Sequence, residues 1–271
     1  MARSYLFKTS IITHPFQRTG EILLFIVDHL GASLIFFSKA IIRIFGRRQF
    51  NNIISQVLEI GTRSITIVVI VGLFTGMVLG LQLYYTLVKF GSQGVIGAAI
   101  SLALIRELGP VLTAIMVTAR SGSAMAAEIG VQRISEQIDA LYTMGINPLS
   151  YLVSPRIAAS IISFPLLTAF FDIVGVFGGW ITAVLLLGTG EGSYFYSMES
   201  SVEMADLKGG FIKSVVFAAI VSTICCYQGF FTHTKKNEYG SRSVGASTTS
   251  AVVISCAMIL VSDYIVTSFL M

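Results

Sequence analysis

An arginine and a glutamate stand side by side in an otherwise apolar run of the sequence, LALIRELGPVL at residues 102–112. If this run crosses a bilayer, a charge in the hydrocarbon core costs roughly 2.5 to 3.5 kcal/mol, which makes lipid a poor neighbour for Arg106 and Glu107. Pro110 lacks the N–H that would bond the carbonyl of Arg106, and a freed carbonyl is tolerated there only beside protein or water. These features predict a turn that borders a hydrated cavity, with a buried network of ion pairs as the alternative.

Other helices must supply partners for these two charges, because adjacent residues of a helix point about 100° apart and do not pair well. Lys213 and Asp263 stand inside two later apolar runs. We expect Arg106 to pair with Asp263, and Glu107 to pair with Lys213. Asp172, in a third apolar run, is a further candidate for the same network.

A stripe of apolar side chains precedes the charged turn and repeats at helical spacing. Its members are Leu79, Leu83, Leu87 and Phe90, at i, i+4, i+8 and i+11. Core packing explains such a stripe more often than ligand contact does. Next to a charged rim, however, the stripe would form a pocket for an amphiphile, with tails on the leucines and a headgroup near Arg106 and Lys213.

Motifs for catalysis or metal binding are missing from the sequence. No P-loop with the spacing G-x-x-x-x-G-K-[ST], no G-x-S-x-G elbow and no cluster of metal ligands occurs, and nothing indicates a nucleic-acid partner. The three cysteines, Cys225, Cys226 and Cys256, fall inside apolar runs and are expected to serve packing. We therefore expect no catalytic residue, metal site or cofactor in this chain, so that uphill transport would draw on an ion gradient or a separate ATPase.

The overall composition places these residues in a membrane. Of the 271 residues, 54% are hydrophobic and 12% are charged, whereas soluble domains are about 45 to 50% apolar. A helix needs about 20 residues to cross the hydrocarbon core. Five runs are long enough, at roughly 64–88, 95–119, 157–187, 211–231 and 246–270. The predicted fold class is an all-α integral membrane protein with five transmembrane helices.

The positions of lysine and arginine predict how the spans are oriented. These residues cluster before the first span, between spans two and three, and between spans four and five, and such loops face the cytoplasm. The connection at residues 188–208 is acidic and falls on the opposite side. Its charged residues are Glu191, Glu199, Glu203, Asp206 and Lys208. The pattern predicts a cytoplasmic N-terminus and a C-terminus on the far side of the membrane.

Residues 22–45 form a further apolar stretch, which basic residues flank at both ends. The charged or titratable residues that interrupt it are Asp28, His29, Lys39 and Arg43. We interpret the stretch as an amphipathic helix in the cytoplasmic interface, with Lys and Arg stems reaching toward water, in preference to a sixth span. Residues 1–50 would then be an N-terminal cytoplasmic and interfacial segment, and residues 51–271 a single membrane domain.

A polar interval follows the second span, at residues 131–156. Apolar positions repeat there at helical spacing, at Ile134, Ile138 and Leu141. The pattern ends at the turn-forming residues Gly145, Asn147 and Pro148. It predicts a short amphipathic helix on the cytoplasmic side with Glu136 and Asp139 on its wet face. Such a helix is either a docking element or an ordinary surface helix.

Two sets of small residues spaced four apart predict close helix packing. They are Gly72, Gly76 and Gly80 in the first span, and Gly122, Ala126 and Gly130 after the second. Small residues at this spacing let the backbones of transmembrane helices approach each other. Contacts inside one subunit are the preferred interpretation, with a seam between two subunits as the alternative.

An ordered set of motifs along about residues 55–271 resembles the MlaE family of ABC-transporter permeases. The likeness centres on RELGPVLTAIMVTARSGSAMAAEIG and SEQIDALYTMGINPLSYLVSPR. It extends upstream to GMVLGLQ and downstream to IKSVVFA and SDYIVTSFLM. A lone RELGP is a weak signal, whereas the ordered set is specific.

The resemblance implies a homodimeric permease of the bacterial inner membrane that moves phospholipids between the inner and outer membranes. A cytoplasmic ABC ATPase dimer would bind ATP and Mg²⁺ and supply the energy. A hexameric MCE-domain protein would bind lipid on the periplasmic side, where the C-terminus would also lie. A small accessory protein on the ATPase is a further partner that the resemblance implies.

The same resemblance implies roles for individual residues. A lipid cavity at the dimer interface would be lined or supported by Leu79, Leu87, Phe90, Arg106, Glu107, Lys213 and Asp263. The segment 131–147 would be the coupling helix, seated in a groove of the ATPase. Its contact residues would be Arg133, Glu136, Asp139, Leu141 and Gly145. The general permease pattern E-A-A-x-x-x-G is only partly present there, in IDALYTMG.

Two other functions fit the same residues. An ion-coupled secondary transporter of an amphiphile would use Glu107 and Asp263 as its relay. A structural membrane anchor for an envelope complex would need neither Arg106 nor Glu107. A stoichiometric ATPase partner on purification would separate the permease from both alternatives.

Overall fold

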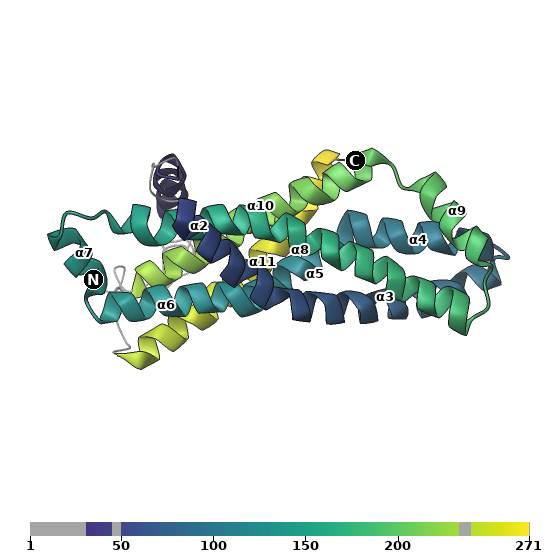
Figure 1. Ribbon diagram of the computed structural model, residues 1–271, viewed down its shortest axis with the longest axis horizontal. Helices are drawn as coiled ribbons and strands as arrows, with labels where there is room; N and C mark the ends of the chain where they lie inside the picture. The colour runs from purple at the N-terminus through teal and green to yellow at the C-terminus, as the bar shows by residue number, and fades with distance from the viewer. Residues whose placement is uncertain (1–30, 45–49, 233–239, 271) are drawn as a thin grey trace, which may run out of the picture.

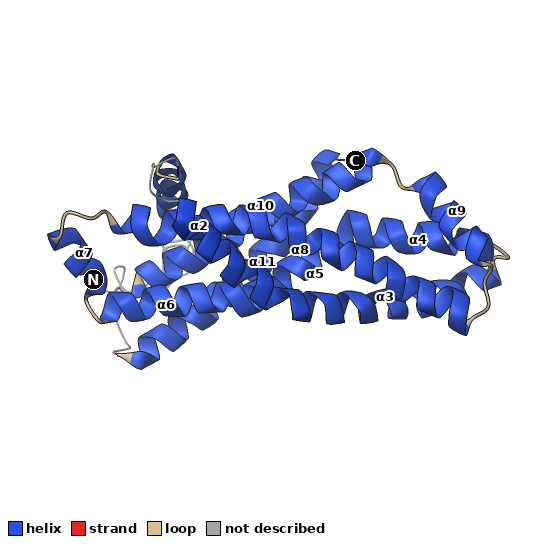
Figure 2. Cartoon of the chain, in the orientation of Figure 1, coloured by secondary structure: helices blue, strands red, loops and turns tan. Residues whose placement is uncertain are grey.

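A bundle of long helices sets the long axis of the molecule. The computed structural model describes residues 31–44, 50–232 and 240–270. Every regular element in these residues is helical, and none is a strand (Figure 2). The bundle is elongated, with helix α7 (Gln137–Thr143) at one end and helix α9 (Glu191–Ser201) at the other (Figure 1). We call these the α7 end and the α9 end.

Five helical rods in the described residues are long and apolar enough to cross a membrane. They are Phe50–Lys89, Gln93–Ile134, Leu149–Leu186, Met204–Phe230 and Ser241–Leu270. Each rod begins before the apolar run that predicts it, because helical hydrogen bonding continues into the polar residues that flank the run. The predicted fold class with five spans is confirmed.

The first three rods alternate between α-helical and π-helical turns. The α-helices of the five rods are α2 (Phe50–Val57), α3 (Arg63–Lys89), α4 (Ile96–Ala103), α5 (Gly109–Val117), α6 (Ser123–Ile134), α8 (Ser154–Trp180), α10 (Met204–Phe230) and α11 (Ser241–Leu270). The remaining turns are η1 (Leu58–Thr62), η3 (Leu104–Leu108), η4 (Thr118–Gly122), η5 (Leu149–Val153) and η6 (Ile181–Leu186), all π-helical, and the 3₁₀ turn η2 (Gln93–Val95). Single π turns change the face that a helix presents and are frequent at functional sites.

Helices α3 and α8 pack with their backbones in contact. Gly76 of α3 lies so close to Gly175 of α8 that a Cβ on Gly76 would overlap the carbonyl oxygen of Gly175. The flanking contacts pair Gly72 with Phe171 and Gly80 with Thr182. The first set of small residues therefore packs helices within one chain, as preferred from the sequence.

The second set of small residues also packs inside the chain. A Cβ on Gly122 would lie 3.0 Å from the Sγ of Cys225 on α10, and Gly229 of α10 lies against the carbonyl of Ala126. Cys225 and Cys226 are buried members of two apolar clusters, as expected for packing residues. All three cysteines are free thiols, and Cys256 is half-buried.

The helical stretch Gly31–Ile42 stands across the bundle rather than along it (Figure 1). Phe36 is buried among aromatic rings of the last turn of α10, with its ring centroid 5.8 Å from that of Phe230. The hydroxyl of Ser154 donates a 2.8 Å hydrogen bond to the carbonyl of Ala40. The described part is too short to span a bilayer, while residues 22–30 and 45 of the predicted interfacial helix lie outside the described residues. Its place in the membrane interface stays a prediction.

Candidate functional site

The charged turn of the second rod is a π-helical segment, η3, and Gly109 and Pro110 follow it as the first two residues of α5. The proline cannot donate a backbone hydrogen bond to the preceding turn. The carbonyl of Arg106 instead accepts a 2.8 Å hydrogen bond from the Nζ of Lys213 on α10. The sequence predicts that protein or water satisfies this freed carbonyl, and a buried lysine side chain does so.

Lys213 links three elements through its ammonium group. The residue is 2% exposed. Besides the carbonyl of Arg106, its Nζ contacts Glu107 Oε2 at 2.6 Å and Asp263 Oδ1 at 3.1 Å. An ammonium group has three N–H donors, and these three acceptors match them in number. The expected pair of Glu107 with Lys213 is confirmed.

The expected pair of Arg106 with Asp263 is wrong. The Nε of Arg106 lies 2.7 Å from Oδ1 of Asp206, and Asp263 pairs with Lys213. Asp206 belongs to the first turn of α10, where its carboxylate also accepts a 3.0 Å hydrogen bond from the backbone N–H of Glu203. Hydropathy starts this span at residue 211, whereas the helix starts at Met204 and brings Asp206 to the bundle.

Two sequence signals mark Asp206. Glu203 and Asp206 form a capping box, a reciprocal pattern that announces the start of a helix. Asp206, Gly210 and Lys213 then follow at i, i+4 and i+7, which places them on one helix face. Together these signals place the start of the fourth span N-terminal to its apolar run, and they place Asp206 and Lys213 on the helix face that packs against one neighbouring helix.

An open cleft of about 350 Å³ lies beside these ion pairs. Its walls come from η3, the first turns of α10 and the last turns of α11. The lining residues are Arg106, Glu107, Glu203, Ala205, Asp206, Gly209, Gly210, Lys213, Thr267 and Leu270. The side chains of Arg106 and Glu107 are 42% and 37% exposed, so one cation and one anion face the cleft. The hydroxyl of Thr267 contacts Glu107 Oε1 at 3.3 Å.

The apolar stripe lies elsewhere in the single chain. Leu79, Leu83 and Leu87 are partly buried against the main core, and Phe90, just beyond α3, is 76% exposed. None of the four lines the charged cleft. The structure thus brings Arg106, Glu107, Lys213 and Asp263 together and leaves the stripe apart from them. The assignment of the stripe to a substrate site stays a prediction.

Asp172 does not belong to the charged network, contrary to expectation. Its carboxylate fills the space that Gly109 leaves, because a Cβ on Gly109 would overlap Asp172 Oδ1. It lines an apolar cavity of about 360 Å³ together with Ile105 and Phe211. Its buried Oδ1 has no hydrogen-bond partner among the described residues.

The predicted coupling segment is broken into two helices. The rod ends with α6 at Ile134, and α7 begins at Gln137. Glu136 between them has a φ of 58°, a left-handed conformation that turns the chain sharply. The short amphipathic helix predicted within 131–147 is α7, and it is shorter than that range because 131–134 still belong to α6 and Glu136 separates the two helices. Gly145, with a φ of 75°, follows the end of α7 in the same conformation.

The side chains of the coupling segment present both charge and apolar surface. Arg133 Nη1 pairs with Asp139 Oδ1 at 2.8 Å, and Glu136 is exposed. Ile138 is buried, and Leu141 is half-buried. Exposed apolar residues at this end are Tyr142, Met144 and Ile146. Their contact with a partner stays a prediction.

Comparisons with known proteins give a consistent result. The family described as permease MlaE matches residues 53–269. The intermembrane phospholipid transport system permease protein MlaE of Haemophilus influenzae is 35% identical over 90% of this chain and 97% of its own. A probable ABC transporter permease protein of Rickettsia conorii is 42% identical over 79% and 81%. The chloroplast protein TRIGALACTOSYLDIACYLGLYCEROL 1 of Arabidopsis thaliana is 34% identical over 87% and 66%. The chain belongs to the MlaE permease family.

Proposed function

We propose that this chain is the permease subunit of an ABC transporter that moves phospholipids between the inner and outer membranes of a bacterial envelope. It would be a multi-pass protein of the inner membrane. Its family membership and its similarity to a phospholipid transport permease of Haemophilus influenzae support this proposal. The observation that carries it is the charged cleft, which places ionic groups inside apolar helices where an amphiphile's headgroup needs them.

The cleft offers a phospholipid headgroup groups of both signs. Arg106 engages Asp206 through Nε, and a guanidinium group has further N–H donors for a phosphate. Glu107 exposes a carboxylate next to it, which suits a headgroup that carries an amine. Leu79, Leu83, Leu87 and Phe90 would take the acyl chains where two copies of the chain form the transport cavity.

Energy would reach the cleft from the α7 end. We assign this end to the cytoplasm, together with the N-terminus, and the α9 end and the C-terminus to the periplasm. A cytoplasmic ABC ATPase dimer would bind ATP and Mg²⁺ and contact the coupling segment through Arg133, Glu136, Asp139, Leu141 and Gly145. Closure of the ATPase would push on α7, and the closely packed helices would transmit a rigid-body shift that narrows the cavity.

The remaining partners follow from the same proposal. Two copies of the chain would form a homodimer with the lipid cavity between them. A hexameric MCE-domain lipid-binding protein would receive or deliver phospholipid in the periplasm, and a small accessory protein would bind the ATPase. The chain itself would bind no metal or nucleotide cofactor and catalyse no reaction.

The ion-coupled alternative is not favoured. Its relay needs Glu107 and Asp263 to exchange protons or ions, yet the structure holds both carboxylates against the ammonium group of Lys213. A relay carboxylate held in this way cannot exchange its partner without leaving a buried cation uncompensated, which is costly.

A transport assay with a charge reversal tests the proposal. The co-purified complex is placed in proteoliposomes, and ATP-dependent phospholipid transfer is measured for Arg106→Glu and Lys208→Glu. Lys208 is exposed on α10 and does not line the cleft, which makes it the matched control. We expect transfer to fall by about tenfold or more in Arg106→Glu alone, since a guanidinium contact to phosphate is worth roughly that factor. Full transfer by an assembled Arg106→Glu complex would disprove the proposed site.

A further inference from the structure

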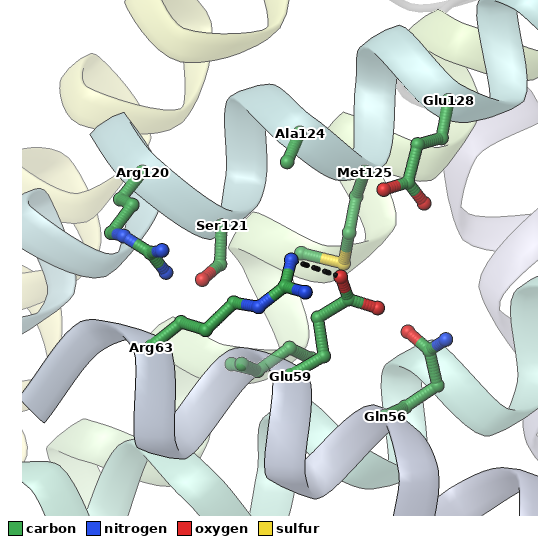
Figure 3. A pocket seen from close by; sticks show the side chains of 9 residues that line it. Gln56, Glu59, Arg63, Arg120, Ser121, Ala124, Met125 and Glu128 are labelled. Atoms are coloured by element: carbon green, nitrogen blue, oxygen red, sulfur yellow. Dashed lines mark hydrogen bonds and ion pairs between the residues drawn. The ribbon is translucent and has the colours of Figure 1, made fainter.

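A second charged pocket lies nearer the α7 end, between the first and second rods. It measures about 110 Å³. Its lining residues are Gln56, Glu59, Ile60, Arg63, Arg120, Ser121, Ala124, Met125 and Glu128. In Figure 3, Arg63 from α3 and Arg120 from η4 extend into the space between the two rods, with Ser121 beside them. The roles proposed above do not use this pocket.

The charged residues that line the pocket, counted with Arg156 that pairs with one of them, carry an excess of positive charge. Glu59 Oε1 pairs with Arg63 Nη1 at 2.8 Å, and Glu128 Oε2 pairs with Arg156 Nη2 at 2.7 Å. Arg156 is only 5% exposed and does not line the pocket, so it neutralises Glu128 from within the protein. Arg120 is exposed and forms no ion pair with any residue that the structure describes. Both glutamates are thus occupied, and Arg120 stands beside Arg63 without an anion.

The depth of the two arginines in the bundle indicates which anion would meet them. Arg63 is the first residue of α3 and immediately precedes the apolar run 64–88. Arg120 immediately follows the apolar run 95–119 of the neighbouring rod. Both guanidinium groups therefore stand where hydrocarbon gives way to headgroups, and long basic side chains at such places reach toward lipid phosphates. Planar guanidinium groups bind phosphate through paired hydrogen bonds.

An exposed apolar face continues from Arg63 along α3. Its members Ile67, Ile70, Phe74 and Val78 follow Arg63 at i+4, i+7, i+11 and i+15. This spacing places them on the same helix face as the arginine. They are between 37% and 59% exposed, and most of them line a shallow apolar groove of about 380 Å³. This surface of α3 thus has a positively charged group at one end and a row of exposed apolar side chains that could contact an acyl chain.

We propose that Arg63 and Arg120 bind the phosphate of a phospholipid whose acyl chain lies along Ile67, Ile70 and Phe74 of α3. This is a second lipid site, in the leaflet at the α7 end, distinct from the cleft of Arg106 and Lys213. It rests on the proposed function only in that its occupant is the same class of lipid as the transported one. The site is where phospholipid of that leaflet first meets or last leaves the permease.

Photo-crosslinking tests the site. The complex is reconstituted in vesicles of phosphatidylethanolamine and phosphatidylglycerol that contain a phosphatidylglycerol with a diazirine near the top of one acyl chain. Peptide mapping by mass spectrometry then locates the label. We expect label on the α3 segment that includes Ile67 and Ile70, and about a tenfold loss of that label in Arg120→Gln. Arg120→Lys, which keeps the charge, should retain part of it, and Arg242→Gln, an exposed arginine at the start of α11, should retain all of it.

Two further arms identify the source of the anion. A diacylglycerol with the same diazirine lacks the phosphate and should label α3 about tenfold less. Millimolar inorganic phosphate should not displace the lipid, because it lacks the acyl chain. Labelling that is unchanged in Arg120→Gln, equal labelling by the diacylglycerol, or loss of label to inorganic phosphate would each overturn the proposal.

The outcome does not depend on the transport site. Arg106→Glu should lower transfer by about tenfold or more and leave the α3 label in place, because the pocket of Arg63 and Arg120 shares no residue with the cleft. If Arg106→Glu transports normally while Arg120→Gln loses the label, the cleft is not the transport site and the second lipid site stands. If the wild-type complex transfers no phospholipid while the α3 label still depends on Arg120, the proposed function itself fails and the second lipid site stands. If Arg106→Glu loses transfer while Arg120→Gln keeps the α3 label, the proposed function stands and the second lipid site is ruled out.

Discussion

At the scale of single residues, Lys213 holds the charged cleft together. Its buried ammonium group contacts the carboxylates of Glu107 and Asp263 and the backbone carbonyl of Arg106. Loss of the cation would leave two carboxylates close together in a partly buried site and a carbonyl without its donor. Breaking a buried pair in this way is costly because the remaining charges are uncompensated.

We predict that Lys213→Met lowers the free energy of unfolding by about 3 to 5 kcal/mol. Unfolding of the purified chain in mixed micelles, followed by circular dichroism, measures the change. Lys208→Met removes an exposed lysine from the same helix and should shift stability by less than about 0.5 kcal/mol. Adding Glu107→Gln and Asp263→Asn to Lys213→Met should recover part of the loss. Wild-type stability in Lys213→Met would contradict the three-way contact.

Sequence could predict half of this network for a physical reason. Glu107 stands in the middle of an apolar run and Lys213 near the start of another, so each needs a charged partner inside the bundle, and few are present. The partner of Arg106 depends instead on where α10 begins. A hydropathy plot does not detect a helix whose first turn is polar. A prediction from apolar residues alone therefore assigns Asp206 to a loop, although it lies in the first turn of α10.

At the scale of elements, close contacts decide which helices become neighbours. The five spans could be predicted from the lengths of the apolar runs in the sequence. The π turns and the choice of neighbouring helices could not, because they depend on contacts between residues that are distant in the sequence. Gly76 shows this difference. Its spacing predicts that it packs against a helix, but only the structure identifies Gly175 of α8 as the residue that it meets.

We predict that Gly76→Ala destabilises the fold by about 1 to 3 kcal/mol, the usual cost of overpacking, because its Cβ would overlap a backbone oxygen that cannot rotate away. Gly245→Ala is the matched control. Gly245 is exposed within α11 and has nothing within 4 Å of an added Cβ, so alanine there should stabilise the helix by up to about 1 kcal/mol. Thermal unfolding of both variants in the same detergent compares them. Equal midpoints would show that α3 and α8 are not packed this closely.

The turn after η3 allows a second element-level test. A Cβ on Gly109 would overlap the carboxylate of Asp172, so Gly109→Ala should lower the unfolding midpoint. Asp172→Ala removes the obstructing oxygen, and the double variant should recover stability. We predict a coupling energy of about 1 kcal/mol or more between the two changes, as for residues in direct contact. Simple additivity in the double-mutant cycle would mean that the carboxylate does not occupy this space.

At the scale of the whole molecule, one rod connects the coupling segment to the charged cleft. The rod Gln93–Ile134 carries Arg106 and Glu107 in η3, and Ser135 and Glu136 join its end to α7 (Figure 1). In the proposed function, a force on α7 would pass through this two-residue connection to the rod that lines the cleft. Sequence could locate this segment by its polarity, but not the left-handed Glu136 that breaks it, since glycine is the usual residue in that conformation.

We predict that Glu136→Lys combined with Asp139→Lys prevents binding of the ATPase or uncouples ATP hydrolysis from lipid transfer. Both side chains are exposed at the α7 end, and reversal of two charges at a docking surface repels a complementary partner. Co-purification of the ATPase, its hydrolysis rate and phospholipid transfer are measured together. Glu191→Lys with Glu199→Lys makes the same change in charge on exposed residues of α9 and should leave ATPase binding intact. If the α7 variant assembles and transports normally, force enters the permease elsewhere, and the continuity of the rod has no part in coupling.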